Sequence, residues 1–240
     1  MLEAAPVQGP PSPNHALPQS IHVQDGGKEC REAALITSPY TTPSHLLSLA
    51  TLDQPTQLLA KSLTVLEPTC EDYATAPYAD SFNWPAVFTL LQDLCKGEAY
   101  TWDTKREFFV VVFRSRLLPD ADINLLYELD ERSHEEGNLS GGLLKYWFGQ
   151  TNSSRENLAT CKYSTDRLGS CALGCRFIHP MLIETGIWRS RVDAQRGGLG
   201  PWHCTARESA REMYERVWFG MLKLEVDDGG RNWAFTEWAE

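Results

Sequence analysis

Hydrophobic positions recur in blocks along the second half of the chain, and their spacing predicts strands and helices in turn. Residues 108–114 (FFVVVFR) are apolar on both faces, which predicts a central strand. Apolar positions at helical spacing over residues 120–136 predict a helix that Asp120 caps. Residues 143–148 predict a second strand, and residues 157–161 begin a third.

The C-terminal part of the chain predicts one more helix and two more strands. Thr205 and Glu208 form a capping-box pattern, and an apolar face continues from there to Val217. Residues 222–226 alternate between apolar and charged side chains, and a turn at Asp228 leads into a last strand. The order of strand, helix, strand, strand, helix and strand is the split βαβ (βαββαβ) arrangement of ferredoxin-like α+β domains.

Three regions of the chain differ in composition. Residues 1–42 are rich in proline and polar side chains and show no apolar period, which predicts a disordered arm. Residues 43–97 are leucine-rich and contain a helix capped by Asn83 with Pro85 in its first turn, which predicts a helical subregion packed on the core. The α+β domain is predicted over residues 98–240.

Charge and composition exclude several classes of protein. The chain has 22 basic and 32 acidic side chains and a formal net charge of −10, which argues against partners with phosphate backbones or anionic membrane surfaces. We find no secretory signal and no apolar run of about 18 residues. We therefore expect no nucleic-acid or membrane partner and a cytoplasmic location, with the nucleus as the alternative. The seven cysteines are irregularly spaced and predict no disulfide framework.

Residues 162–186 do not fit the pattern, because they separate residues 157–161 from the strand-like residues 187–190. The peptide Cys-Lys-Tyr at 161–163 can be encoded with a splice donor, and Thr-Gly at 185–186 with an acceptor. Excision between them would keep the reading frame and rebuild the cysteine codon. Our hypothesis is that residues 162–186 are a translated intron; if they are protein, a loop extruded from the sheet is the expected form.

Three possible metal ligands lie inside this segment. Cys171, Cys175 and His179 have zinc-like spacing, but they lack a fourth ligand. We therefore predict no metal site, and nothing in the sequence calls for a cofactor.

Several motifs together resemble an uncharacterised fungal protein family of unknown function. The resemblance runs from Leu46 to Trp238, and members of that family lack a counterpart of residues 162–186. The motifs are FFVVVFRS, LDERSHEE, SGGLLKYWFG, NLATC, IWRS, GPWH and MYERVW.

The domain is more distantly similar to the antibiotic-biosynthesis-monooxygenase-like dimeric α+β barrels. The positions that carry this likeness are Trp188, Ser190, Pro201, His203, Ala206 and Tyr214. The likeness implies a homodimer with a pocket between sheet and helices. It also implies a cofactor-independent tailoring or oxygenating enzyme of secondary metabolism, acting on an aromatic or polyketide-like compound. A non-catalytic dimeric binding or scaffold protein is the alternative.

Two histidines are candidate catalytic groups. His203 precedes the C-terminal helix and is either an acid or base at a pocket mouth or a helix cap. His134 is either catalytic or, near the end of its helix, a protonated ring that interacts with the helix dipole.

Six further residues are candidate ligand contacts. Lys145 and Trp147 share one face of the predicted strand with Leu143, while Tyr146 joins the other face. Facing a pocket, these side chains would contact an anion, a carbonyl oxygen or a planar ring; facing the helices, they would only pack. Trp188 is a second ring of this kind. Arg114 and Arg189 end their strands and form either a second anion site or surface ion pairs.

The loop Gln195–Gly200 offers a different function. Its Q-x-x-G-x-G pattern before a helix resembles the turn with which GNAT-type acetyltransferases bind the pyrophosphate of acetyl-CoA. This pattern makes an acyltransferase the second alternative function. Against it, Pro201 removes one of the amides that such a turn needs.

Overall fold

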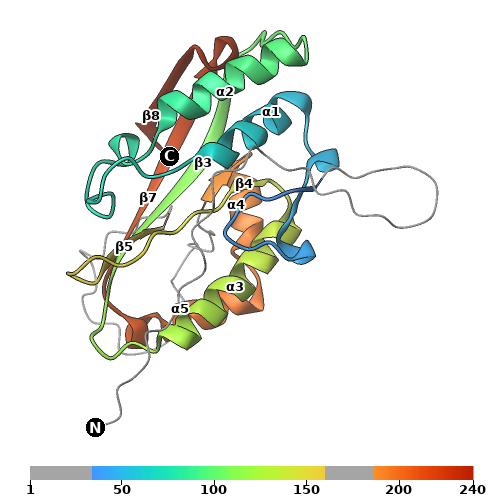
Figure 1. Ribbon diagram of the computed structural model, residues 1–240. Helices are drawn as coiled ribbons and strands as arrows, with labels where there is room; N and C mark the ends of the chain where they lie inside the picture. The colour runs from blue at the N-terminus through green and yellow to red at the C-terminus, as the bar shows by residue number, and fades with distance from the viewer. Residues whose placement is uncertain (1–33, 160–185, 240) are drawn as a thin grey trace, which may run out of the picture.

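The computed structural model describes residues 34–159 and 186–239, which form an α+β fold. Figure 1 shows the sheet running between two groups of helices. The helices are α1 (Gln54–Ser62), α2 (Trp84–Gly97), α3 (Ile123–Ser140), α4 (Arg191–Gly197) and α5 (Pro201–Met213). The strands are β1 (Ala34–Leu35), β2 (Leu47–Ser48), β3 (Arg106–Leu117), β4 (Leu143–Lys145), β5 (Glu156–Ala159), β6 (Gly186–Trp188), β7 (Tyr214–Asp227) and β8 (Asn232–Glu237).

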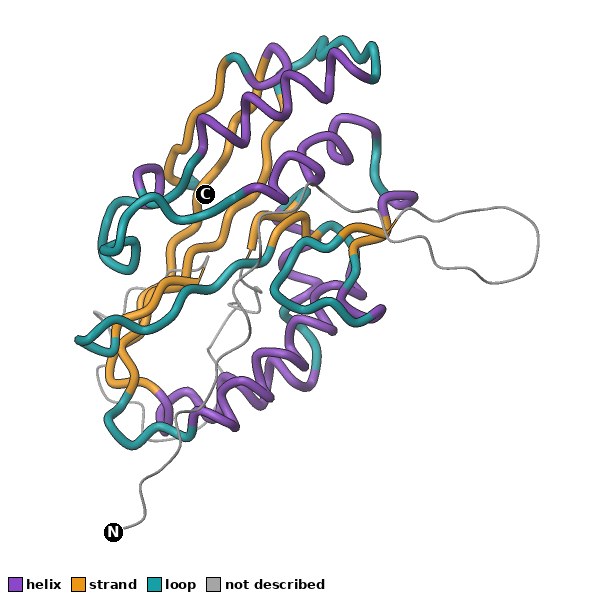
Figure 2. Tube along the Cα trace, in the orientation of Figure 1, coloured by secondary structure: helices purple, strands orange, loops and turns teal. Residues whose placement is uncertain are grey.

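The main sheet is antiparallel and has the strand order β4-β6-β3-β7-β8. β3 lies at its centre and pairs with β7 along its whole length, and β5 pairs with β3 beyond the end of β6. Figure 2 shows β3 and β7 as the long strands of this sheet. The continuous apolar run of β3 is explained by its position, since both faces of the strand are covered.

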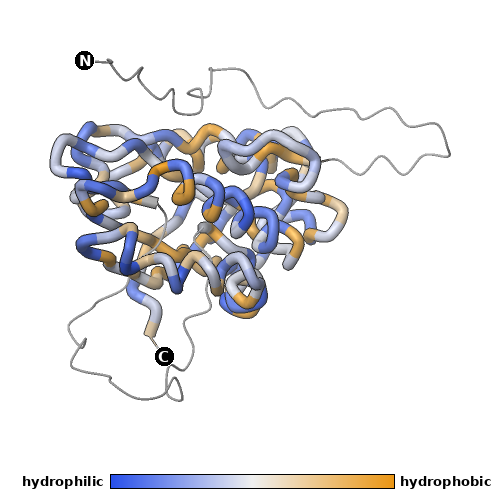
Figure 3. The backbone as a smooth tube through the Cα atoms, turned by 90° about the horizontal axis from the view of Figure 1, so that it is seen from below, coloured by the Kyte–Doolittle hydropathy of each residue, from blue (hydrophilic) through white to orange (hydrophobic). Residues whose placement is uncertain are grey.

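Each face of the sheet has its own hydrophobic core. Phe108, Val110 and Val112 point from β3 into a core shared with α1 and α2, which also contains Trp84 and Phe88. The opposite side of β3 faces a smaller core and the helices α3 and α5. Viewed from below, hydrophobic and hydrophilic positions alternate along the helices, as expected for helices with one buried side (Figure 3).

The predicted elements are found, with shifted boundaries. α2 has Pro85 in its first turn, as predicted, and Asn83 at the N-cap position, but the Asn83 side chain does not cap the helix. It bonds the backbone of Glu67 and Val65 instead. α3 is capped by Asp122 rather than Asp120, because its side chain accepts the hydrogen bonds of two backbone N–H groups. α3 also continues through Gly137 to Ser140.

The capping box at Thr205 was wrong. Thr205 lies inside α5, where its hydroxyl donates to the carbonyl of Pro201. The helix already ends at Met213, so Val217 belongs to β7. The predicted end of the helix was wrong because Val217 suits a strand and a helix face equally well.

The predicted alternation along residues 143–148 was also wrong. Leu143, Tyr146 and Phe148 lie on the side of α3, and Leu144 and Trp147 lie on the side of α1 and α2. The pairing of β4 with β6 shifts register between Leu143 and Lys145, and such a bulge reverses the side on which later residues point.

The N-terminal region is ordered earlier than predicted. Ala34–Leu35 pair with Leu47–Ser48, although residues 34–42 were assigned to the disordered arm. The remainder of that arm lies outside the described residues. From β1 to α2, the chain covers the face of the sheet that lies opposite α3 and α5, as predicted for a helical subregion packed on the core. The homodimer implied by the likeness to dimeric barrels stays a prediction.

β5 and β6 behave as two halves of one strand. Ala159 lies opposite Phe113 and Gly186 lies opposite Val111, so a step of two residues on β3 corresponds to 27 residues on the partner. Removing 25 residues would leave one strand in continuous register, with Ile187 opposite Val110 as observed. The partner strand thus has 25 residues more than the register on β3 requires, and this number equals the length of the predicted insertion, residues 162–186. Apart from Gly186, these residues lie outside the described ranges.

In residues 34–159 and 186–239, no helix combines the length and the apolar character that a bilayer crossing requires.

Candidate functional site

A cavity of about 170 Å³ lies between the sheet and the helices α3 and α5. β3 and β7 supply its floor through Phe113 and Phe219, which lie opposite each other in the sheet. Its walls are mostly apolar, with polar groups concentrated on the two helices. The helical lining residues are Leu126, Leu129, Asp130, Ser133, His134, His203, Ala206, Arg207, Ala210 and Met213.

His203 is held in this cavity by a carboxylate. Its Nδ1 lies 2.9 Å from Oε2 of Glu136, a residue of α3. Glu136 also accepts the backbone N–H groups of Trp202 and His203, at 2.9 and 3.1 Å, and so caps the first turn of α5. Burial lowers the pKa of His203, and Glu136 opposes this effect. Nδ1 of His203 therefore donates to the Glu136 carboxylate, and this hydrogen bond fixes the orientation of the ring.

Asp130 forms a second polar group at the cavity wall. It accepts hydrogen bonds from the hydroxyls of Tyr40, at 2.5 Å, and of Tyr146. Burial raises the pKa of the Asp130 carboxyl despite these two hydrogen bonds. Tyr40 comes from the N-terminal segment, and its ring lies nearly parallel to that of Tyr146 with centroids 6.4 Å apart. The predicted ligand residue Tyr146 therefore does line the cavity.

His134 forms the third polar group and contacts another histidine. Its Nδ1 lies 2.7 Å from Nδ1 of His45, and both rings are buried. His134 occupies the middle of α3 rather than its end. Burial, together with His45 and His203, lowers its pKa to about 3. The ring is therefore neutral, and the interpretation as a protonated group stabilised by the helix dipole was wrong.

The neutral state of His134 predicts acid destabilisation. The folded-state pKa lies below the unfolded value of 6.5, so the unfolded chain binds the proton first and stability falls as the pH decreases below 6.5. Between pH 8 and pH 5 this group should cost about 2 kcal/mol. Urea unfolding of wild type and His134→Gln at both pH values measures the difference. An equal pH dependence in the two proteins would contradict the prediction.

The structure does not bring Arg114 and Arg189 together. Arg189 follows Trp188, which pairs with Phe109, five positions from Arg114 along β3 and roughly 17 Å away at strand spacing. Arg189 instead forms a two-point ion pair with Asp193, at 2.9 and 2.8 Å.

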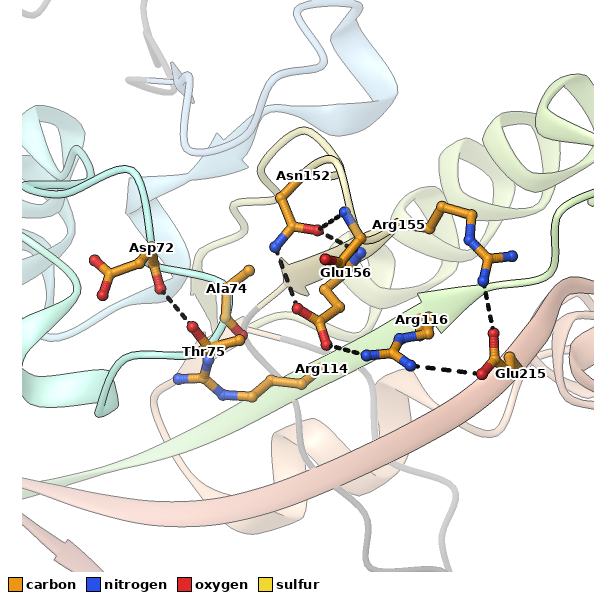
Figure 4. Close-up of polar contacts among 10 residues, drawn as sticks. Asp72, Ala74, Thr75, Arg114, Arg116, Asn152, Arg155, Glu156 and Glu215 are labelled. Carbon is orange, nitrogen blue, oxygen red and sulfur yellow. Dashed lines mark hydrogen bonds and ion pairs between the residues drawn. The ribbon is translucent and has the colours of Figure 1, made fainter.

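Arg114 stabilises the loop before α2. Its guanidinium donates to the carbonyls of Tyr73, Ala74 and Ala76. Figure 4 shows it beside the ion pairs of the neighbouring Arg116 on the same strand. Burial lowers the pKa of Arg114. These contacts assign Arg114 to the packing of this loop.

The remaining ligand candidates lie outside the cavity lining. Trp147 contacts Tyr73 and Phe82 on the side of α1 and α2. Trp188 is completely buried in the smaller core. Lys145 is buried in β4, and burial lowers its pKa to about 8. Of the group Lys145, Tyr146 and Trp147, only Tyr146 reaches the cavity.

The loop at Gln195–Gly200 already holds an anion of the chain itself. A Cβ on Gly200 would lie 2.1 Å from Oε2 of Glu136, so the carboxylate sits directly against this glycine. The amides of Trp202 and His203 that would face a pyrophosphate donate to Glu136 instead. The helix N-terminus is thus occupied, and this geometry gives the acyltransferase alternative no support.

Four residues of this site were missed by the sequence analysis, namely Tyr40, His45, Asp130 and Glu136. Asp130 and His134 lie on the side of α3 that faces the cavity, together with Leu126 and Leu129. A polar residue on an otherwise apolar helix face was the sequence signal that could have identified Asp130. The other three depend on contacts between distant segments. In the described ranges, no three His, Cys, Asp or Glu side chains are grouped to hold a metal ion, and Cys171, Cys175 and His179 lie outside them.

Comparison with known proteins places the chain among relatives of unassigned function. The profile of the PB2B2.08-like family matches residues 36–170 and 179–237. The match includes residues 162–170 and 179–186, so the expectation that family members lack a counterpart of the whole segment 162–186 was wrong, and only residues 171–178 of that segment lie outside the match. The UPF0643 protein PB2B2.08 of Schizosaccharomyces pombe (strain 972 / ATCC 24843) is 29% identical over 230 residues, covering 92% of this chain and 93% of that protein. No solved structure matches the chain. With more than half of its length matched by the profile, the chain belongs to the PB2B2.08-like family.

Proposed function

We propose that this protein binds a small, mainly apolar molecule with a hydroxyl group in the cavity between the sheet and helices α3 and α5. In this proposal, His134 and His203, the latter oriented by Glu136, both hydrogen-bond the hydroxyl group and transfer protons to or from that molecule. The observation that carries the proposal is the convergence of His203 and His134 on one apolar cavity. A histidine paired with a carboxylate is a common general acid–base arrangement.

The size of the cavity sets the size of the ligand. A cavity of about 150 Å³ is known to accept benzene. The 170 Å³ found here is therefore suited to one six-membered ring with a small polar substituent. An aromatic compound, or one ring of a polyketide-like compound, meets this requirement.

We also infer a ferredoxin-like fold for the domain. The order β4-β6-β3-β7, with the crossover helices α3 and α5 in contact, supports this assignment. α1, α2 and β8 are then additions to the fold. Cofactor-independent tailoring or oxygenation, which the distant likeness to monooxygenase-like barrels implies, would begin with the same removal of a proton from the ligand.

A non-catalytic binding protein is the second candidate. It would use the same cavity without proton transfer.

Phenol and anisole distinguish specific hydrogen bonding from simple burial, because both have one ring and only phenol donates a hydrogen bond.

The test is calorimetric titration of the protein with phenol and with anisole. One additional hydrogen bond to a histidine should make phenol bind about 5- to 10-fold more tightly than anisole. His203→Ala should reduce this ratio. Ala210→Leu should weaken both ligands by filling the cavity, since Ala210 is part of its lining.

Ala86→Leu is the matched control, because Ala86 is an exposed residue of α2. It should leave both affinities unchanged. Saturable binding that Ala210→Leu does not affect would place the ligand elsewhere and contradict the proposal. Absence of binding by both compounds at millimolar concentration would also contradict it.

A further inference from the structure

The pair of histidines connects the cavity with the molecular surface. His134 lines the cavity and is 1% exposed, and His45 lies behind it at 2% exposure. On the far side, Nε2 of His45 lies 4.0 Å from Oε1 of Glu131, whose side chain is 54% exposed. One line of groups therefore runs from the cavity through two imidazole rings to a carboxylate in solvent.

The short contact between the rings restricts their protons. Two Nδ1 atoms 2.7 Å apart share one proton, so one ring donates and the other accepts. The accepting ring, when neutral, then carries its own proton on Nε2. The two rings therefore have opposite tautomers, and a change in one requires a change in the other.

Glu131 selects between the two arrangements. A carboxylate next to Nε2 of His45 favours a proton on that nitrogen. Nδ1 of His45 then accepts the proton of His134, and Nε2 of His134 carries a lone pair. Nε2 of His134 is buried and has no hydrogen-bond partner among the residues that the structure describes. Because His134 lines the cavity, a hydroxyl bound there is the donor that we assign to this nitrogen.

We propose that His134 and His45 form a proton relay that carries a proton from a ligand in the cavity to Glu131 at the surface. His134 is the group that touches the ligand, and His45 and Glu131 act through it. The proposal rests on the proposed function, since the ligand is the hydroxyl compound described there.

The relay moves one proton per step and no electrons. The ligand hydroxyl gives its proton to Nε2 of His134, the Nδ1 proton of His134 passes to Nδ1 of His45, and the Nε2 proton of His45 leaves to Glu131. The last gap of 4.0 Å is closed by one bridging water or by rotation of the exposed Glu131 side chain. Afterwards both tautomers are reversed, and the reverse movement returns a proton to the cavity.

The surroundings keep both rings neutral, as a relay of this kind requires. Burial is the main cause of the lowered pKa of each ring. His45 also faces Glu131, Glu135 and Arg132, whose charges partly cancel. His134 additionally faces His45 and His203, which disfavour a positive charge on it.

Nitrogen-15 NMR of histidine-labelled protein at pH 7.5 tests the relay without any ligand. We expect a pyridine-type Nε2 and a pyrrole-type Nδ1 in His134, and the opposite pattern in His45. Glu131→Gln removes the selecting charge and should shift Nε2 of His134 toward the pyrrole type. This response is diagnostic in combination with a variant at His45, because His45 lies between Glu131 and His134.

His45→Phe provides the second arm of the experiment. In that background, Glu131→Gln should no longer change His134, because the connection between them is missing. Glu128→Gln is the charge-matched control one turn earlier on α3 and should leave both rings unchanged. The fold of each variant is checked on its amide spectrum, and exposed Glu131 and Glu128 tolerate substitution.

Two results would overturn the relay. The first is a pyrrole-type Nε2 of His134 in the wild type, which excludes it as an acceptor. The second is a response of His134 to Glu131→Gln that persists in His45→Phe. Both measurements use the protein without ligand. Failure of phenol binding would overturn the proposed function, whereas the NMR measurements test the tautomers of the two histidines independently of it.

Discussion

Deletion of residues 162–186 should raise the melting temperature by roughly 6–12 °C. The deletion would place Cys161 opposite Val111 and keep Ile187 opposite Val110, so that β5 and β6 become one strand on β3. Closing a connection of 25 residues between two neighbouring strand positions costs about 3 kcal/mol of chain entropy. For a chain of this size, each kcal/mol corresponds to roughly 2–4 °C. Thermal unfolding followed by circular dichroism measures the change.

A deletion one residue shorter is the matched control. Removing residues 162–185 leaves Gly186 as an extra residue after Cys161, and a one-residue slip turns side chains to the wrong face. This variant should gain less stability than the full deletion, or none. Equal melting temperatures for the wild type and the full deletion would contradict the expected gain. Sequencing of the transcript tests the intron hypothesis separately, and a message that always contains the segment would refute it.

Replacement of Trp188 by alanine should destabilise the protein by about 3–5 kcal/mol. Trp188 is 0% exposed and packs with Phe109 and Leu143 in the smaller core. The substitution leaves a large cavity between β6 and its neighbours. At roughly 2–4 °C for each kcal/mol, the melting temperature should fall by about 6–20 °C.

Trp202→Ala is the control for this substitution. Trp202 is 38% exposed, and its ring is contacted by the guanidinium of Arg132 at 5.6 Å. Its loss should cost about 1 kcal/mol or less. A Trp188→Ala protein with wild-type stability and weakened phenol binding would show that Trp188 is a ligand contact, as the sequence analysis allowed, rather than a core residue.

The sequence predicted elements well where the pattern was strong and local. The apolar run of β3 and the amphipathic α2 were found where expected. The exact end of α5 was missed, because Val217 fits either structure. The bulge in β4 was missed as well, since it depends on pairing with β6 and not on residues 143–148 themselves.

The candidate site could be predicted only in part. His134, His203 and Tyr146 were singled out as polar residues within patterned elements, and all three line the cavity. Their partners could not be found in this way, because Tyr40 lies 90 residues from Asp130 and His45 lies 89 residues from His134. Contacts over such distances are set by tertiary packing, which a single sequence does not display.

The pairing of β3 with β7 has a consequence for synthesis on the ribosome. Arg116 lies opposite Arg216, so the central strand is translated 100 residues before its main partner. At about 5–20 residues per second, this interval lasts roughly 5–20 s. During that time one edge of an apolar strand has no partner, and such an edge readily pairs with other chains. The nascent protein should therefore depend on chaperones until β7 has emerged.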